Sequence, residues 1–74
     1  MKKSGVAGRV GENIKARRLE MGLSQAGLAE ALGVTAQAVS KWENGLSMPE
    51  PTKLPEIAEL FGTSIDGIFS ESGK

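Results

Sequence analysis

The sequence of 74 residues lacks cysteine and histidine entirely. These absences exclude disulfide bonds, thiol chemistry, Cys/His zinc sites and every catalytic triad that uses histidine. No apolar run is long enough to span a membrane. The charged start Met1-Lys2-Lys3 is not followed by the apolar stretch of a signal peptide. We therefore expect a cytoplasmic protein that does not associate with a membrane.

Groups that could carry out catalysis are also scarce. Asp66 is the single aspartate, and its place at a predicted helix start suits it to the helix dipole. The sequence offers no paired carboxylates, no phosphate-binding loop and no nucleophile beside a base. We expect no enzymatic activity, no metal and no cofactor.

The net charge of zero conceals an asymmetry along the chain. Residues 1–45 include seven Lys or Arg and four Glu, whereas residues 46–74 include two Lys and five Asp or Glu. A basic N-terminal half can present one positive face to a polyanion. The alternative is an ordinary solvated surface, and the zero total argues mildly against a nucleic-acid binder.

Hydrophobic periodicity and helix-stop residues predict an all-α fold of five short helices around one small core. We expect a flexible N-terminal arm at residues 1–8, a domain at residues 9–69 and a C-terminal tail at residues 70–74. Val10, Ile14 and Leu19 should share one face of the first helix, which begins at Arg9 and stops before Gly22. The later helices should cover Gln25 to Leu32, Ala36 to Glu43, Lys53 to Phe61 and Ile65 to Phe69, with Ser24, Thr35, Thr52 and Ser64 as their N-caps.

The second and third predicted helices are joined so tightly that they indicate a helix-turn-helix at about residues 24–44. Gly33 can adopt the positive φ that reverses the chain, and Val34 can anchor the turn in the core. Small Ala29 permits a close approach of the two helices. Two short helices joined in this way meet at a large angle. An ordinary helical hairpin in a small bundle is the alternative.

The third predicted helix separates its two faces. Val39 and Trp42 should face inward, with Trp42 packed beneath the helix. The outward stripe carries amide, hydroxyl and ammonium groups, which can hydrogen-bond to base edges and phosphates; its members are Gln37, Ser40, Lys41 and Asn44. A polar surface without a ligand is the alternative. Gln25, at the start of the preceding helix, suits a phosphate oxygen or serves only as a solvated capping residue.

These residues stand in runs that resemble a known family. The runs are Ile14-Lys15-Ala16-Arg17-Arg18, Gly22-Leu23-Ser24-Gln25, Leu28-Ala29, Leu32-Gly33-Val34-Thr35 and Val39-Ser40-Lys41-Trp42-Glu43-Asn44-Gly45. They resemble the Xre-type, phage-repressor-like (Cro/lambda repressor-like) helix-turn-helix family over residues 10–69. The resemblance implies a compact five-helix DNA-binding domain and a sequence-specific transcriptional regulator, more readily a repressor than an activator.

The resemblance also implies roles for individual residues. Base contacts would come from Thr35, Ala36, Gln37, Ser40 and Lys41, and phosphate contacts from Gln25, Asn44 and Arg17. Arg18 and Glu43 would form a salt bridge that orients the recognition helix. Ile65, Ile68 and Phe69 would either close the core or form dimer contacts. The implied partner is double-stranded DNA with a palindromic operator, bound by a homodimer.

Two departures from the family pattern, and one other function, stay open. Gly27 replaces the acidic residue that often closes a capping box on Ser24, which should weaken the second helix. Ala36 and Ala38 leave the recognition helix with few hydrogen-bonding groups, so DNA shape should contribute to specificity. The same fold could instead serve as a protein-interaction or antitoxin-like module, with the acidic C-terminal half and the apolar last helix as its binding surface.

Overall fold

A computed structural model describes residues 5–70 of the chain. These residues form five α-helices and one short 3-10 turn, with no strand among them. The elements are α1 (Gly5–Glu20), α2 (Gln25–Leu32), α3 (Ala36–Glu43), η1 (Pro51–Lys53), α4 (Leu54–Phe61) and α5 (Ile65–Phe69). The prediction of five helices, with α2 and α3 as a helix-turn-helix, is confirmed.

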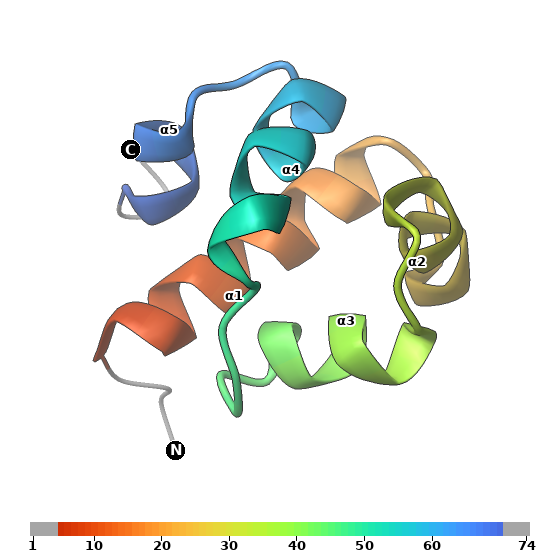
Figure 1. The fold of residues 1–74 in the computed structure, drawn as a ribbon, viewed down its shortest axis with the longest axis horizontal. Coiled ribbons are helices and arrows are strands. Elements are labelled where there is room, and N and C mark those ends of the chain that lie inside the picture. The colour runs from red at the N-terminus through yellow and green to blue at the C-terminus, as the bar shows by residue number, and fades with distance from the viewer. Residues whose placement is uncertain (1–4, 71–74) are drawn as a thin grey trace.

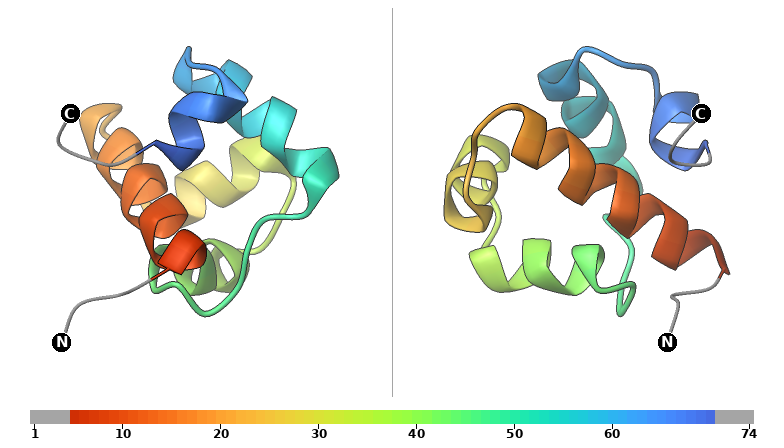
Figure 2. Two further views of the ribbon diagram at one scale, coloured as in Figure 1. Left: turned by 90° about the vertical axis from the view of Figure 1, so that its left-hand side faces the viewer. Right: turned by 180° about the vertical axis from the view of Figure 1, so that it is seen from behind.

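The helices surround one small core, with α1 in the middle of the molecule (Figure 1). α3 lies along one side of α1, and α4 and α5 lie on the other side, while α2 closes one end. The views in Figure 2 agree with this arrangement. The most deeply buried side chains come from four helices: Val10, Ile14, Leu28, Val39 and Ile57. Burying such aliphatic side chains is the main source of the fold's stability.

Local capping chemistry sets most of the helix boundaries. The Ser24 hydroxyl accepts a hydrogen bond from the Gly27 amide at 2.9 Å, and the Thr35 hydroxyl accepts one from the Ala38 amide at 3.0 Å. Ser64 caps α5 in the same way. Gly33 has a φ of 72°, the left-handed conformation that ends α2 and begins the turn. These predicted caps and the turn are confirmed.

The first helix differs from the prediction at its start and on one face. Residues 5–8, expected in a flexible arm, belong to α1, and residues 1–4 lie outside the described part of the chain. Gly8 and Gly11 are both buried, so tertiary packing overrides the low helix propensity of glycine. Leu19, expected in the core, is 57% exposed. At about 100° per residue, Leu19 lies roughly 140° around α1 from buried Ile14, so it faces away from the core.

The start of the fourth helix also differs from the prediction. Thr52 does not cap it, because residues 51–53 form the 3-10 turn η1 and α4 begins at Leu54 without a side-chain cap. Pro51 suits this turn, since its ring fixes φ and its missing N–H has no partner to lose there. Pro55 falls in the first turn of α4, as expected. Of the predicted tail, Ser70 follows α5 directly, and residues 71–74 lie outside the described range.

Candidate nucleic-acid interface

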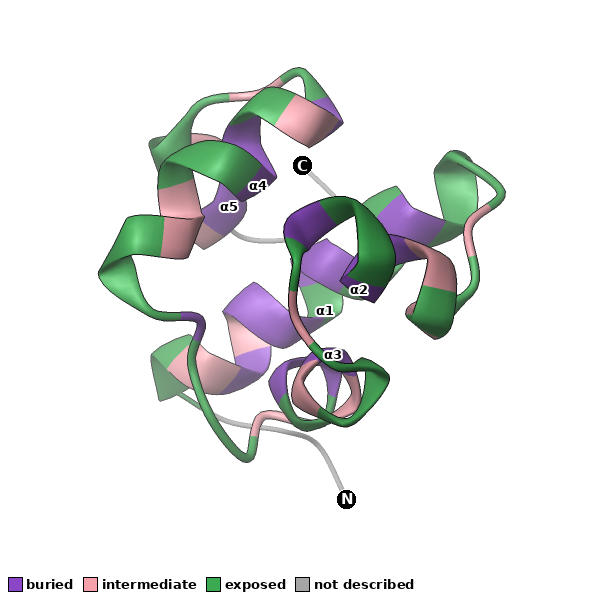
Figure 3. Cartoon of the chain, turned by 45° about the vertical axis from the view of Figure 1, so that its right-hand side comes forward, coloured by how far each residue is buried: buried purple, intermediate pink, exposed green. Residues whose placement is uncertain are grey.

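α3 presents one apolar face to the core and one polar face to solvent. Val39 and Trp42 are 0% and 5% exposed, and they pack toward α1 and α2. Figure 3 views α3 nearly end-on, with its buried residues turned toward α1 and its exposed residues turned away. The exposed face brings together five predicted DNA contacts, namely Thr35, Ala36, Gln37, Lys41 and Asn44. We refer to this set, together with half-buried Ser40, as the α3 stripe.

The α3 stripe is mostly uncharged. Lys41 supplies its one cation, and the Asn44 amide donates to the Ser40 hydroxyl at a long 3.4 Å. Gln37, Lys41 and Asn44 project from one side of the helix at intervals of three and four residues. Amide and ammonium groups in this spacing match the acceptors and donors of base edges in a DNA major groove.

A buried ion pair fixes the C-terminal end of α3 against α1. Arg18 Nε lies 2.7 Å from Glu43 Oε2, and Arg18 Nη2 lies 3.1 Å from Glu43 Oε1. The two side chains are 10% and 3% exposed. The hydrogen bond to Glu43 raises the pKa of the Arg18 guanidinium, although burial acts in the opposite direction. The predicted salt bridge is confirmed, and its two parallel bonds define the orientation of α3.

The same ion pair also anchors the start of α2. Arg18 Nη1 donates to the Leu23 carbonyl at 2.9 Å, just before the α2 cap. Gln25 Nε2 donates to Glu43 Oε1 at 3.0 Å. Sequence patterns could suggest a phosphate contact for Gln25 but not this bond, because Glu43 lies 18 positions away. An amide nitrogen has two hydrogens, so Gln25 can keep Glu43 and still donate to a phosphate.

Two further residues that hold the helix-turn-helix escaped the sequence analysis. A Cβ added at Gly11 would lie 2.0 Å from the Trp42 carbonyl oxygen, so α1 and α3 approach within backbone contact there. Lys53 Nζ donates to the Leu32 carbonyl at 2.9 Å and thereby caps the C-terminal end of α2. The signal in the sequence for Gly11 was a glycine within a helix, next to the core residue Val10. Nothing in the local sequence marks Lys53.

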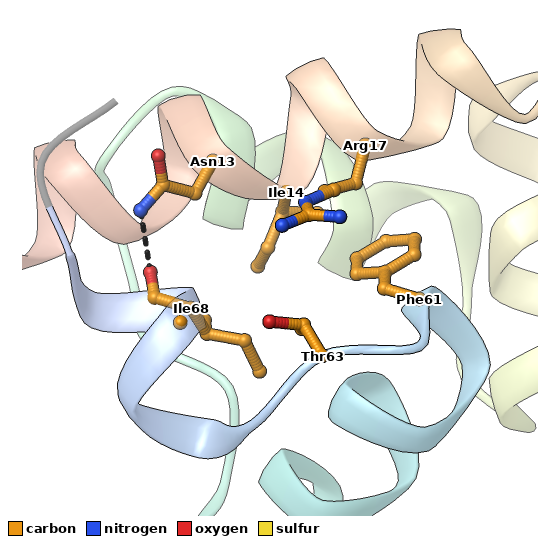
Figure 4. Close-up of a pocket in the computed structure, with 7 residues that line it drawn as sticks. Asn13, Ile14, Arg17, Phe61, Thr63 and Ile68 are labelled. Atoms are coloured by element: carbon orange, nitrogen blue, oxygen red, sulfur yellow. Dashed lines mark hydrogen bonds between the residues drawn. The ribbon is translucent and has the colours of Figure 1, made fainter. Parts of the chain in front are cut away.

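Arg17 is exposed but lies apart from the α3 stripe, and its phosphate contact stays a prediction. It lines a small cavity of about 10 Å³, together with Ile14, Phe61 and Thr63. Figure 4 shows its side chain beside Phe61, on the side of α1 that faces α4 and α5. Adjacent helical positions are turned by about 100°, so Arg17 and Arg18 point to different neighbours.

The three α5 residues predicted as possible dimer contacts differ in how far they are buried. Ile68 is 3% exposed and Phe69 is partly buried against the core, so both help to close the fold, which is one of the two predicted alternatives. The buried Asn13 amide holds this end of α5 by donating to the Ile68 carbonyl at 2.6 Å (Figure 4). It donates also to the Ser70 carbonyl. Ile65 is 40% exposed and is the member of the set that remains open to a partner.

Two other kinds of site are absent from residues 5–70. That range contains no group of three or more acidic residues placed to hold a metal ion. None of its helices combines the length and the apolar character that crossing a bilayer requires.

Known proteins resemble this chain along most of its length. The profile of the helix-turn-helix family matches residues 14–68. An uncharacterized HTH-type transcriptional regulator of Sinorhizobium medicae is 32% identical over 63 residues, which cover 85% of this chain and 45% of that protein. The (S)-2-hydroxypropylphosphonic acid epoxidase of Streptomyces wedmorensis is 38% identical over 66 residues, covering 84% of this chain and 32% of the enzyme.

A solved structure of a DNA complex is also similar. The P22 c2 repressor bound to a synthetic operator superposes with a TM-score of 0.78 at 31% identity, covering 82% of this chain and 92% of the repressor chain. Our chain spans less than half the length of the first curated relatives. With the family profile covering most of its residues and α2 and α3 forming the motif itself, the chain belongs to the helix-turn-helix family.

Proposed function

We propose that this chain is the DNA-reading part of a transcriptional regulator, with α3 inserted in the major groove of double-stranded DNA. The observation that carries the proposal is the α3 stripe. It is polar and exposed, and the Arg18–Glu43 pair fixes the helix that bears it. The likeness to a repressor bound to its operator supports the same mode of binding.

Each member of the α3 stripe has a role in this proposal. Gln37 pairs with an adenine edge through its amide, and Lys41 donates to guanine acceptors. Thr35 and Ala36 lie at the helix N-terminus, where the Ala36 methyl group can contact a thymine methyl group, and Ser40 flanks them. Asn44 and Gln25 donate to phosphates and set the position of the domain on the duplex.

Selection of binding sites from random duplex DNA tests this proposal. We expect one enriched sequence, and Gln37→Ala and Lys41→Ala should each weaken binding to it by about tenfold or more. Lys15→Ala, which removes an exposed lysine from α1, is the matched control and should change affinity little. If no sequence is enriched at low salt, the protein-interaction alternative takes the place of DNA binding.

We further propose that two copies bind one palindromic operator and act as a repressor. Isologous dimers read half-sites about one helical turn apart. Exposed apolar side chains are available for such a contact, namely Ile65 on α5 and Leu46 and Met48 after α3. An enriched inverted repeat would support the dimer, and a single enriched half-site would leave DNA binding without it.

We also propose that this domain has no catalytic activity and works in the cytoplasm, where DNA is accessible. Its likeness to an epoxidase covers only a third of that enzyme. The sequence, which has no histidine or cysteine, offers no motif of paired carboxylates or of a nucleophile beside a base. A regulator of this kind answers to its own concentration or to a partner.

A further inference from the structure

A groove of about 350 Å³ opens behind the helix-turn-helix, between α3 and the connection that leads to α4. Four apolar side chains line it, namely Val34, Ala38, Trp42 and Met48. Gly33 and two residues of opposite charge, Glu50 and Lys53, complete the lining. No residue of the α3 stripe lines this groove, so the groove is separate from the proposed DNA contacts.

The two charged groups leave binding capacity for a ligand. An ammonium group has three hydrogens. Lys53 Nζ donates one to the Leu32 carbonyl at 2.9 Å and another to Glu56 Oε1 at a long 3.4 Å. The third hydrogen can reach a ligand carboxylate. Glu50 is exposed and presents an acceptor for a cationic group.

We propose that this groove binds a free amino acid with an apolar side chain. The ligand carboxylate accepts from Lys53, its ammonium group donates to Glu50, and its side chain covers Trp42, Val34 and Met48. A ligand with one charge would engage only one of Glu50 and Lys53, whereas a zwitterion engages both. The volume lies in the range of small-molecule sites in proteins.

A ligand in this groove would affect the affinity for DNA, because the groove is lined by residues of α3 and of the α2–α3 turn. Val34 lies in the α2–α3 turn, Trp42 lies on α3, and Lys53 holds the end of α2. A bound amino acid therefore contacts α3, the turn that joins it to α2, and the lysine that caps α2. Since binding free energies are reciprocal, a ligand that favours the DNA-bound arrangement raises operator affinity, and the operator raises ligand affinity equally. This regulatory consequence rests on the proposed function, whereas ligand binding itself does not.

Trp42 provides a direct measurement, because it is the one tryptophan of the chain. Each common amino acid is titrated into the purified protein without DNA, and Trp42 fluorescence is recorded. We expect a saturable change with an apolar amino acid, at a dissociation constant between about 10 µM and 10 mM. Glycine, which lacks the apolar side chain, should bind at least about tenfold more weakly.

Modified ligands and matched variants test each charged contact separately. Glu50→Gln should weaken binding about tenfold, while Glu59→Gln, which changes an exposed carboxylate on α4, should have no effect. The N-acetyl derivative, which lacks the ammonium group, should bind the wild type about tenfold more weakly. It should lose little further affinity in Glu50→Gln, because the two changes remove the same contact.

Three results would overturn the proposal. These are no fluorescence change with any amino acid at about 10 mM, equal effects of Glu50→Gln and Glu59→Gln, and equal binding of the free and N-acetylated ligands. A failure of DNA binding is a different outcome. In that case the amino acid would still change Trp42 fluorescence while no duplex sequence is enriched, so the two proposals fail independently.

Discussion

At the scale of single residues, the Arg18–Glu43 pair has the most influence on the interface. It joins α1, the start of α2 and the end of α3 through one buried carboxylate. A buried pair of this kind adds little net stability, because desolvation offsets the attraction of the charges. Its effect is to fix one orientation of α3 among several that the small core would permit.

Removing one partner of this pair should be strongly destabilising. Glu43→Gln leaves the Arg18 guanidinium buried without its counter-charge, so we expect a loss of about 3 kcal/mol in the free energy of unfolding. Urea denaturation measures the loss. The double variant Arg18→Met/Glu43→Leu should regain most of the stability but bind the operator more weakly, since α3 loses its fixed orientation. Full operator affinity in a stable double variant would contradict this role.

Gly11 sets how closely α1 approaches α3, because the backbones of the two helices touch at this residue. Its hydrogen faces the Trp42 carbonyl, and a Cβ there would lie 2.0 Å from the oxygen. Gly11→Ala must push α1 away from α3, and we expect a loss of about 3 kcal/mol or more in the free energy of unfolding, the upper end for overpacked cores. In thermal unfolding this corresponds to roughly 12 °C or more.

Gly27→Ala is the matched control for Gly11→Ala. Its added Cβ would meet the Ser24 hydroxyl at 3.3 Å and Leu23 Cδ2 at 3.5 Å, both side-chain atoms. Alanine should therefore keep or raise the melting temperature through its better helix propensity. A Gly11→Ala variant as stable as Gly27→Ala would show that α1 and α3 can separate without cost.

At the scale of elements, the sequence predicts best what neighbouring residues decide. The boundaries of α2, α3 and α5 follow from the caps Ser24, Thr35 and Ser64, whose bonds reach three positions along the chain. The start of α1 was missed because burial of Gly8 and Gly11 against distant helices outweighs their propensity. The other long-range bonds, such as that from Gln25 to Glu43, depend on tertiary packing too and escaped prediction, whereas the Arg18–Glu43 pair was implied by the family resemblance.

In the candidate site, too, the sequence predicts what neighbouring residues decide and misses contacts between distant ones. Helical periodicity was sufficient to predict the exposed members of the α3 stripe and the inward direction of Val39 and Trp42. It could not predict that Gln25 bonds to Glu43, since that contact depends on how α2 crosses α3. It also left open whether Ile68 closes the core or meets a second copy, because periodicity does not show which helices pack against α5.

The N-terminal turn of α2 offers a stabilising change. Gly27 occupies the third helical position after Ser24, where a glutamate would accept from the Ser24 backbone amide and complete a capping box. Gly27→Glu should raise the free energy of unfolding by about 1 kcal/mol, from helix propensity and the added bond. The free energy comes from urea denaturation, with Gly27→Gln as the uncharged counterpart. A glutamate variant less stable than glycine would contradict the assignment of an open cap.

At the scale of the whole molecule, the balance of charge should govern how salt affects DNA binding. The acidic residues Glu56 and Glu59 lie on α4, on the side of α1 opposite to α3. DNA bound at α3 therefore meets the less acidic side of the domain. The net charge is nevertheless zero, and the α3 stripe holds one lysine. Non-specific attraction to phosphates is therefore weak, and recognition depends on direct contacts and DNA shape.

A salt titration of operator binding tests this distribution of charge. Each phosphate neutralised by a cation contributes about 0.9 to the slope of log affinity against log salt concentration. Lys41→Gln should reduce the slope by at most about this amount, because the stripe loses its one cation, whose charge partly neutralises the phosphates beside the guanine that it contacts. Gln37→Ala should lower affinity at every salt concentration while leaving the slope unchanged, since an amide displaces no counterion. Lys15→Gln on α1 carries the same charge change as Lys41→Gln, so an equal reduction by both variants would mean that attraction is spread over the surface rather than concentrated at α3.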